Sequence, residues 1–239
     1  MLGELTRGIL HLICPPSCHA CLTPLPPDLA YFCPACRDTL LSDPNAVCPR
    51  CAGTIGPYAL VETGCSRCRG ETFHFERAIR LGPYTGLLRE MILRCKQPSG
   101  ENLAQLLGEL WAEHREAGLR EVGVDVVVPV PLHWLRRWQR GHNQSESLAR
   151  ALSARLNLPC ALALRRTRNT PHQTRQSPSG RRDNVRGAFV ARSGVAVARK
   201  SVLLVDDVMT TGSTASEAAR ALRAAGAVRV VAAGLAHGQ

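Results

Sequence analysis

Hydrophobic positions divide the chain into two parts with different patterns. Residues 14–70 show little apolar periodicity and are rich in Cys, Pro and Gly. Such a segment cannot bury enough apolar surface to fold without a cross-link or a metal. From residue 78 onward, apolar runs alternate with stretches of helical periodicity. We therefore expect an N-terminal module over 1–75 and a larger domain over 76–239.

The second part has the pattern of a parallel α/β domain, with a leading segment at about 78–123 and a core at about 124–239. Apolar runs predict strands at 78–81, 124–130, 161–164, 187–191, 201–205 and 228–233. Helical periodicity predicts helices at 2–12, 87–96, 103–114, 145–156 and 213–225. Alternating strands and helices favour a parallel sheet covered on both faces, with ligands beyond the carboxyl ends of its strands. Gly82-Pro83 is expected to end the first strand, and the basic stretch 165–186 to form a long loop.

Composition narrows the class of protein. The chain has 239 residues, 45% hydrophobic and 21% charged, which suits a soluble globular protein and excludes disordered and collagenous classes. Aromatic residues are only 4%, so Leu, Val, Ile and Ala must fill the core. No apolar run approaches the ~20 residues that span a bilayer, and residues 1–13 lack a secretory pattern. We expect a cytoplasmic protein without a transmembrane segment.

The net charge of +11 is concentrated in one stretch. Residues 126–200 hold 15 basic and 2 acidic side chains, whereas the rest of the chain is close to balanced. This location predicts a surface that faces an anion. Arg outnumbers Lys 28 to 2, which can reflect genomic base composition, so the position of the charge says more than the choice of Arg.

Eleven cysteines, nine of them before residue 69, predict metal sites. Clustered thiols in a reducing compartment favour metal over disulfides, and two CxxC pairs complete a tetrahedral zinc site of four thiolates. The gaps between neighbouring pairs suit short hairpins, although pairing the first with the third stays open, as do disulfides and an iron–sulfur cluster. Cys14 is a competing ligand or, like Cys95 and Cys160, a buried thiol. The predicted zinc ligands are Cys18 and Cys21 with Cys33 and Cys36, and Cys48 and Cys51 with Cys65 and Cys68.

The stretch VLLVDDVMTTGST at 202–214 predicts a phosphate-binding turn. An apolar strand delivers Asp206 and Asp207, and the following turn offers backbone N–H groups, hydroxyls and the start of a helix, whose dipole favours a phosphate by ~0.3–1 kcal/mol. The two carboxylates would repel that phosphate unless they face sugar hydroxyls, so a ribose 5-phosphate fits. A Walker A loop and a GxGxxG turn are absent, and an ordinary capped helix does not explain paired acids. The stretch resembles the phosphoribosyl pyrophosphate (PRPP) signature of type I phosphoribosyltransferases, whose contacts here would be Asp206, Asp207, Thr210, Thr211, Gly212, Ser213 and Thr214.

A basic segment follows the strand at 124–130. In the phosphoribosyltransferase fold, the corresponding loop cradles pyrophosphate. Arg136, Arg137 and Arg140 are placed to meet that anion, because Arg binds phosphate oxygens in pairs. The alternative is that some of them lie on a solvated helix face. We expect Asn143 and Gln144 to cap the next helix and shape the loop.

The long basic loop suits either a lid over PRPP or a strip that contacts a nucleic-acid backbone. Trp134 and Trp138 could stack on bases, but core packing is the slightly favoured interpretation because aromatic residues are so few. The candidate nucleic-acid contacts are Trp134, Arg166, Arg168, Arg175, Arg181 and Arg182.

The order of these features resembles the ComF family, the amidophosphoribosyltransferase-like competence proteins, over about 18–234. The features are the Cys-rich N-terminus, Tyr84…Lys96, PVPLHWLRRWQRGHNQS, the Arg186-Gly187-Ala188-Phe189 end of the basic loop, and the PRPP turn. The resemblance implies a type I phosphoribosyltransferase fold preceded by a double zinc ribbon, with the acceptor-binding hood of that fold at about 78–123. It further implies that Arg137, Arg140, Gly141 and Asn143 belong to the pyrophosphate-side loop. It also implies single-stranded DNA uptake in natural transformation. Gln97-Pro98 after Lys96 departs from the expected pattern.

Three functional hypotheses follow. The favoured one is a ComF-like protein that binds PRPP and single-stranded DNA and works with DNA-uptake proteins. The second is an active phosphoribosyltransferase, in which Mg²⁺ accompanies PRPP, arginines stabilise the leaving pyrophosphate, and Asp206 and Asp207 are catalytic because they steady the positively charged sugar. The third is a zinc-ribbon adaptor that only senses PRPP. The acceptor nucleophile and the oligomeric state stay open.

Overall fold

The structure is a computed structural model that describes residues 16–26, 29, 31–56, 58–59, 64–168 and 185–238. Its contacts divide the chain into two compact units, Met1–Ser42 and Asp43–Gln239. The second group of cysteines thus belongs to the larger unit, and the boundary at residue 75 stays a prediction. The expected helix at 2–12 and most of the expected loop at 165–186 lie outside the described residues.

The cysteine-rich part contains short elements that the apolar pattern did not predict. Helix α2, Pro34–Leu41, begins directly after Cys33, with Pro34 in the first turn, where its missing N–H costs nothing. Strands β1, Ala46–Val47, and β2, Thr54–Ile55, pair antiparallel in the larger unit. These elements are too short to carry a detectable hydrophobic period.

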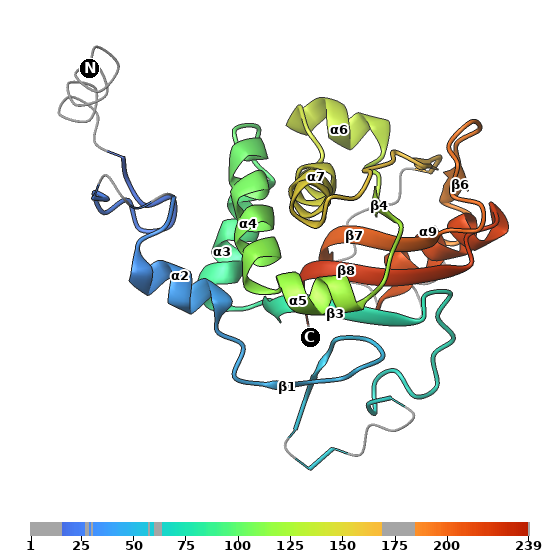
Figure 1. Ribbon diagram of the computed structural model, residues 1–239, viewed down its shortest axis with the longest axis horizontal. Coiled ribbons are helices and arrows are strands. Elements are labelled where there is room, and N and C mark those ends of the chain that lie inside the picture. Colours follow the sequence, from blue (N-terminus) through green and yellow to red (C-terminus); the bar gives the residue numbers. More distant parts are fainter. Residues whose placement is uncertain are drawn as a thin grey trace. The chain divides into compact units, whose positions relative to one another are not determined.

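Four parallel strands form the central sheet in the order β3-β8-β7-β4, which confirms the predicted parallel α/β architecture (Figure 1). The strands are β3, Arg77–Pro83; β4, Val126–Pro129; β7, Ser201–Met209; and β8, Arg229–His237. A separate antiparallel pair consists of β5, Leu164–Arg166, and β6, Phe189–Ala191.

Helices cover the sheet on both sides. They are α3, Gly86–Cys95; α4, Glu101–His114; α5, Glu116–Glu121; α6, Trp134–Arg140; α7, Gln144–Leu156; and α9, Ser213–Ala224. Val202 and Leu204 of β7 share a buried cluster with Ala218 and Leu222 of α9. Because side chains alternate along a strand, Leu203 faces the opposite side, where α7 packs against β4 and β7 and α4 packs on α7. No helix in the described ranges is long and apolar enough to cross a membrane.

Two strands extend further than the sequence pattern predicts. Strand β3 continues through Gly82 and Pro83, which pair with β8. Proline is tolerated there because β3 is an edge strand, so its missing N–H removes no bond to a second neighbour. Strand β7 continues past Val205 to Met209 by pairing with β8, although polar residues interrupt its apolar run. The sequence pattern also failed to predict helices α5 and α6, because neither segment was recognised by its apolar periodicity.

Candidate functional site

The two acids lie on an extension of β7 beyond its neighbour. Strand β4 pairs with β7 only as far as Val205, so Asp206 and Asp207 stand past the end of β4, at the carboxyl edge of the sheet. The first turn of α7 reaches this edge, and Ser145 Oγ donates to Asp206 Oδ1 at 3.0 Å. The backbone N–H of Asp207 donates to the same oxygen at 2.9 Å. The Asp206 carboxylate is thereby fixed toward the site.

Lys96, at the end of α3, supplies a positive charge to the acidic pair. Its Nζ lies 3.1 Å from Asp207 Oδ2. Burial lowers the pKa of Lys96, but the attraction of Asp207 outweighs it and the net shift is upward. Burial and the neighbouring Asp207 raise the pKa of Asp206 to about 7. The sequence marked Lys96 as a family feature without a role, and it did not indicate Ser145 as a partner of the pair.

The predicted phosphate turn follows β7 and begins α9. Gly212 occupies the N-cap position with φ 74°, in the left-handed region that glycine adopts without strain. The hydroxyls of Thr211 and Ser213 lie 2.7 Å apart. The first N–H groups of a helix have no intrahelical acceptor and attract anions. Residues 211–214 are half-buried and Thr210 is exposed, so the turn offers sheltered donors a few residues from the acids.

Three arginines from other elements act on one another electrostatically, and one of them also interacts with Asp206. Burial and the nearby Arg140 lower the pKa of Arg136. Burial and Arg136 lower the pKa of Arg166, while Asp206 acts on it in the opposite direction. Arg136, Arg140 and Arg166 thus form one basic cluster, in which Arg166 is the member that interacts with Asp206. A cluster of this kind can bind a multiply charged anion.

Arg137 and Asn143 have other contacts. Arg137 Nη1 lies 3.0 Å from Glu146 Oε2, and Arg150 contacts the other oxygen of Glu146 at 2.8 Å. Asn143 occupies the N-cap position of α7, but its side chain makes no capping bond and instead donates to the carbonyl of Val130 at 3.1 Å. The expectation that the Asn143 side chain caps α7 was therefore wrong, and Gln144 is the first residue of the helix, not its cap. The bond to Val130 agrees with the expectation that Asn143 shapes the loop.

The two tryptophans of α6 are on the surface, so the favoured interpretation of core packing was wrong. Trp134 is 69% exposed and Trp138 is 79% exposed. They lie one turn apart, on one face of a helix that buries none of its residues. The core contains Trp111 instead, at 1% exposure. The reason is that α6 stands outside the helix layer that α4 and α7 form.

The other nucleic-acid candidates are only partly described. The Arg166 guanidinium lies 5.3 Å from the centre of the Phe189 ring, and Arg168 Nη1 donates to the carbonyl of Arg186 at 2.8 Å. Arg166 is the last residue of β5, and Arg168 follows two residues later. The remaining candidates, Arg175, Arg181 and Arg182, lie outside the described residues, as does Cys14.

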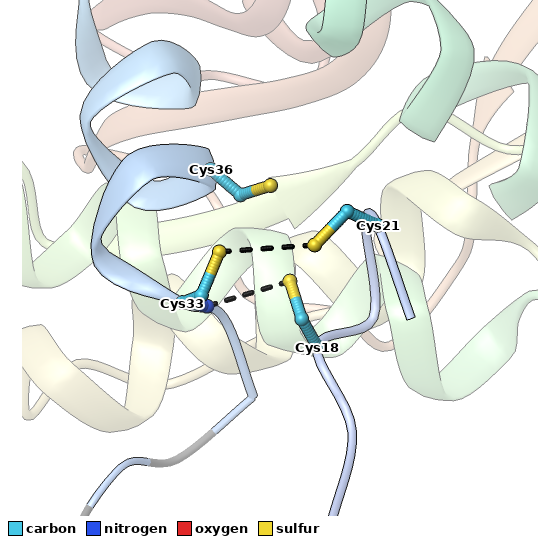
Figure 2. Close-up of side chains that lie close together, drawn as sticks. All are labelled: Cys18, Cys21, Cys33 and Cys36. Atoms are coloured by element: carbon cyan, nitrogen blue, oxygen red, sulfur yellow. Dashed lines mark hydrogen bonds between the residues drawn. The ribbon is translucent and has the colours of Figure 1, made fainter. Parts of the chain in front are cut away.

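The cysteines gather in the two predicted groups. Figure 2 shows the sulfurs of Cys18, Cys21, Cys33 and Cys36 turned toward one another, with Cys36 in the first turn of α2. The Cys21 and Cys33 sulfurs are 3.8 Å apart, and the backbone N–H of Cys33 donates to Cys18 Sγ. A tetrahedron with Zn–S bonds of ~2.3 Å has edges of about 3.8 Å, so this group fits a zinc ion.

The second group has the same geometry and is fully buried. The distances are 3.7 Å between the sulfurs of Cys48 and Cys68 and 3.6 Å between those of Cys51 and Cys65. Burial opposes ionisation of Cys48, but backbone N–H groups outweigh it and lower its pKa to about 7. Both groups could bind zinc. Of the two thiols expected to be buried outside them, Cys95 is buried and Cys160 is only half-buried.

Comparison with known proteins agrees with this site. The family model for the phosphoribosyl transferase domain matches residues 142–238, which include α7, the acidic pair and the phosphate turn. The glutamine PRPP amidotransferase of B. subtilis aligns with 59% of this chain and 30% of its own, at 26% identity and a TM-score of 0.40. A structural similarity of that size does not by itself establish a fold.

Two curated relatives match more than two thirds of the chain. Competence protein F of Haemophilus influenzae is 30% identical over 187 residues, which are 72% of this chain and 78% of that protein. DNA utilization protein YhgH of Escherichia coli K12 is 34% identical over 170 residues, which are 70% of this chain and 74% of its own.

The parallel sheet, the acid pair at its carboxyl edge and the matched domain define a type I phosphoribosyltransferase fold, here combined with two four-cysteine groups. Among proteins with this fold, the chain belongs to the ComF family.

Proposed function

We propose that this protein binds Mg²⁺–PRPP at the carboxyl edge of its sheet and single-stranded DNA on the adjoining basic surface, and that it assists DNA uptake in the cytoplasm. The single observation that carries the PRPP proposal is the acidic pair of β7 beside the first turn of α9. Paired carboxylates accept hydrogen bonds from a vicinal diol, while the turn donates to a phosphate. The role in DNA uptake rests on the competence and DNA utilization proteins among its relatives.

The pyrophosphate of PRPP would meet Arg136, Arg140 and Arg166. Their crowding supports this assignment, because each neighbouring cation disfavours the charge of the next, and a polyanion relieves that repulsion. Arg137 would act less directly, since Glu146 already neutralises it. In this proposal Mg²⁺ arrives with the pyrophosphate, so no separate protein site for magnesium is required.

The test of ligand binding is titration calorimetry with PRPP in the presence and absence of Mg²⁺. We expect saturable heat with Mg²⁺, and no sustained release of pyrophosphate when nucleobases or amines are added. Absence of heat would contradict the PRPP site. Steady release of pyrophosphate with one acceptor would show that the protein is an active phosphoribosyltransferase and does not only bind PRPP.

The proposed DNA surface consists of the exposed face of α6 together with Arg168 and the further arginines of the basic loop. It leaves out Arg136, Arg140 and Arg166, which the pyrophosphate would engage. Its exposed tryptophans, Trp134 and Trp138, can stack on successive bases while arginines contact phosphates. We expect affinity for a single-stranded oligonucleotide to fall as salt rises, because each phosphate contact releases counterions, with a slope of about −0.7 per contact. Fluorescence anisotropy over a range of salt concentrations measures this slope.

Replacing both tryptophans with alanine should weaken DNA binding at least about tenfold, since each stacked base contributes ~1–3 kcal/mol. Tyr58→Ala is the matched control, because Tyr58 is an aromatic residue at 96% exposure that lies outside α6. Equal affinities of the tryptophan variant and the control, or a flat salt dependence, would exclude α6 as the binding surface.

A further inference from the structure

Phe73 connects the second cysteine group with the core of the phosphoribosyltransferase domain. It lies between Cys68 and β3, and its ring packs against the buried cluster of Cys48, Cys51, Cys65 and Cys68. The same ring packs against the apolar cluster that contains β7 and α9. It stacks on Phe75, with ring centres 4.5 Å apart and planes 14° from parallel. The Phe73 side chain therefore packs against both the second cysteine group and the apolar core of the domain.

Arg50 fixes the cysteine side of this connection. It stands between Cys48 and Cys51, and its guanidinium carbon lies 5.2 Å from the centre of the Phe73 ring. Its guanidinium donates to the carbonyls of Cys68 and Glu71, and its own carbonyl accepts from the N–H of Ala78 at 3.0 Å. The first CxxC pair of this group thus holds the segment that carries Phe73, together with the start of β3.

The phosphate turn lies close to the same ring. A Cβ atom at Gly212 would lie 3.1 Å from Cε1 of Phe73 and 3.4 Å from Cζ of Phe75. One residue further along, the backbone N–H of His74 donates to Ser216 Oγ, in the first turns of α9, at 3.1 Å. The residue that lets the turn adopt a positive φ therefore lies so near Phe73 that even a methyl group at this position would be crowded by the ring.

We propose that Phe73 is a positioning residue through which metal in the second cysteine group keeps the phosphate turn in its binding conformation. The ligand side of this inference rests on the proposed PRPP site. Without metal, the four buried cysteines are no longer joined through one ion, and the segment that carries them has few apolar side chains to keep it folded. The support of Phe73 and Arg50 is then lost, and the turn adopts additional conformations. Apparent affinity falls in proportion to the fraction of molecules with a competent turn.

Amide hydrogen exchange tests the coupling without any ligand. Four samples are compared. They are the zinc-loaded wild-type protein, the wild-type protein after chelation of zinc, and the zinc-loaded variants Phe73→Ala and Phe73→Leu. We expect faster exchange of the amides of residues 210–216 after chelation and in Phe73→Ala, with a smaller change in Phe73→Leu, which keeps apolar volume but loses stacking. Unchanged exchange of these amides after zinc release would overturn the proposal. Circular dichroism establishes that each variant is folded.

Cys36→Ser is the matched control, because it removes a ligand of the first group, which belongs to the separate unit Met1–Ser42. Exchange at 210–216 should be unchanged in this variant, and an acceleration equal to that in Phe73→Ala would show a general effect of zinc loss. PRPP titration then separates the two proposals. Phe73→Ala should bind Mg²⁺–PRPP about tenfold more weakly if the competent fraction falls to a tenth. Absence of binding by the wild-type protein would contradict the PRPP site, whereas equal affinities of wild type and Phe73→Ala would contradict the coupling alone.

Discussion

The variant Asp206→Asn/Asp207→Asn is expected to lose the rise in melting temperature that Mg²⁺–PRPP causes in the wild-type protein. At a hundredfold excess over Kd, a ligand stabilises the native state by about 2.7 kcal/mol. Hydrogen bonds from sugar hydroxyls to charged carboxylates contribute ~1.5–3 kcal/mol each, so loss of both should weaken affinity by at least about a hundredfold. Differential scanning calorimetry with and without ligand measures the effect.

Asp125→Asn is the control for this pair. Its carboxylate accepts from the N–H of Ser201 at 2.7 Å, at the opposite end of β7. We expect this variant to keep the ligand-induced rise in melting temperature. If the Asp206→Asn/Asp207→Asn variant kept the full ligand-induced rise in melting temperature, the assignment of both residues to the ligand site would be contradicted.

The Asp206 carboxylate is expected to make the free energy of unfolding depend on pH even in the absence of ligand. Burial and Asp207 raise the pKa of Asp206 to about 7, so between its ordinary pKa near 4 and pH ~7 the native state binds more protons than the unfolded state. Stability conferred by the protonated group is present at low pH and is lost as the pH rises through 7. The single variant Asp206→Asn should therefore exceed wild type in free energy of unfolding at about pH 8, and less so at about pH 5. Urea denaturation at a series of pH values measures this difference. A difference between the two proteins that does not change with pH would contradict the raised pKa.

Removing a ligand from the second cysteine group is expected to have the other large effect. In small zinc modules, metal binding is worth ~10–16 kcal/mol. The second group closes a buried site in the larger unit, where Ala52, next to Cys51, belongs to the apolar core and Arg80 donates to its carbonyl at 3.0 Å. Cys48→Ser should therefore lower the melting temperature of the larger unit and reduce zinc content from two ions per chain to one. Atomic emission and thermal denaturation measure the two effects.

Cys160→Ser is the control for a cysteine outside both groups. Its thiol is half-buried, and its replacement should leave the zinc content at two. Purified protein that contains no zinc and no free thiols would show that disulfides, rather than metal, hold these segments.

The paired acids and the CxxC spacing could be interpreted from the sequence because the relevant residues are neighbours in the chain. Asp206 and Asp207 follow an apolar run directly, and two residues between cysteines suffice to aim both sulfurs at one metal. The exact extent of β7 could not be predicted, because its last residues are held by hydrogen bonds to β8 rather than by their own apolar pattern. The exposure of Trp134 and Trp138 also depends on where α6 stands relative to α4 and α7.

By itself, the sequence determined the alternation of strands and helices, the two groups of four cysteines, the turn from β7 into α9 and the family, because each of these depends on the spacing of residues that are close together in the chain. Only the tertiary structure decided which distant residues reach the acids: Lys96 from the end of α3 and Ser145 from α7 contact them. Arg166 from β5 interacts with Asp206 electrostatically. The tertiary structure also placed Phe73 between a cysteine group and the phosphate turn. The physical reason is that these contacts join segments tens of residues apart, and packing of the sheet, not local sequence, brings them together.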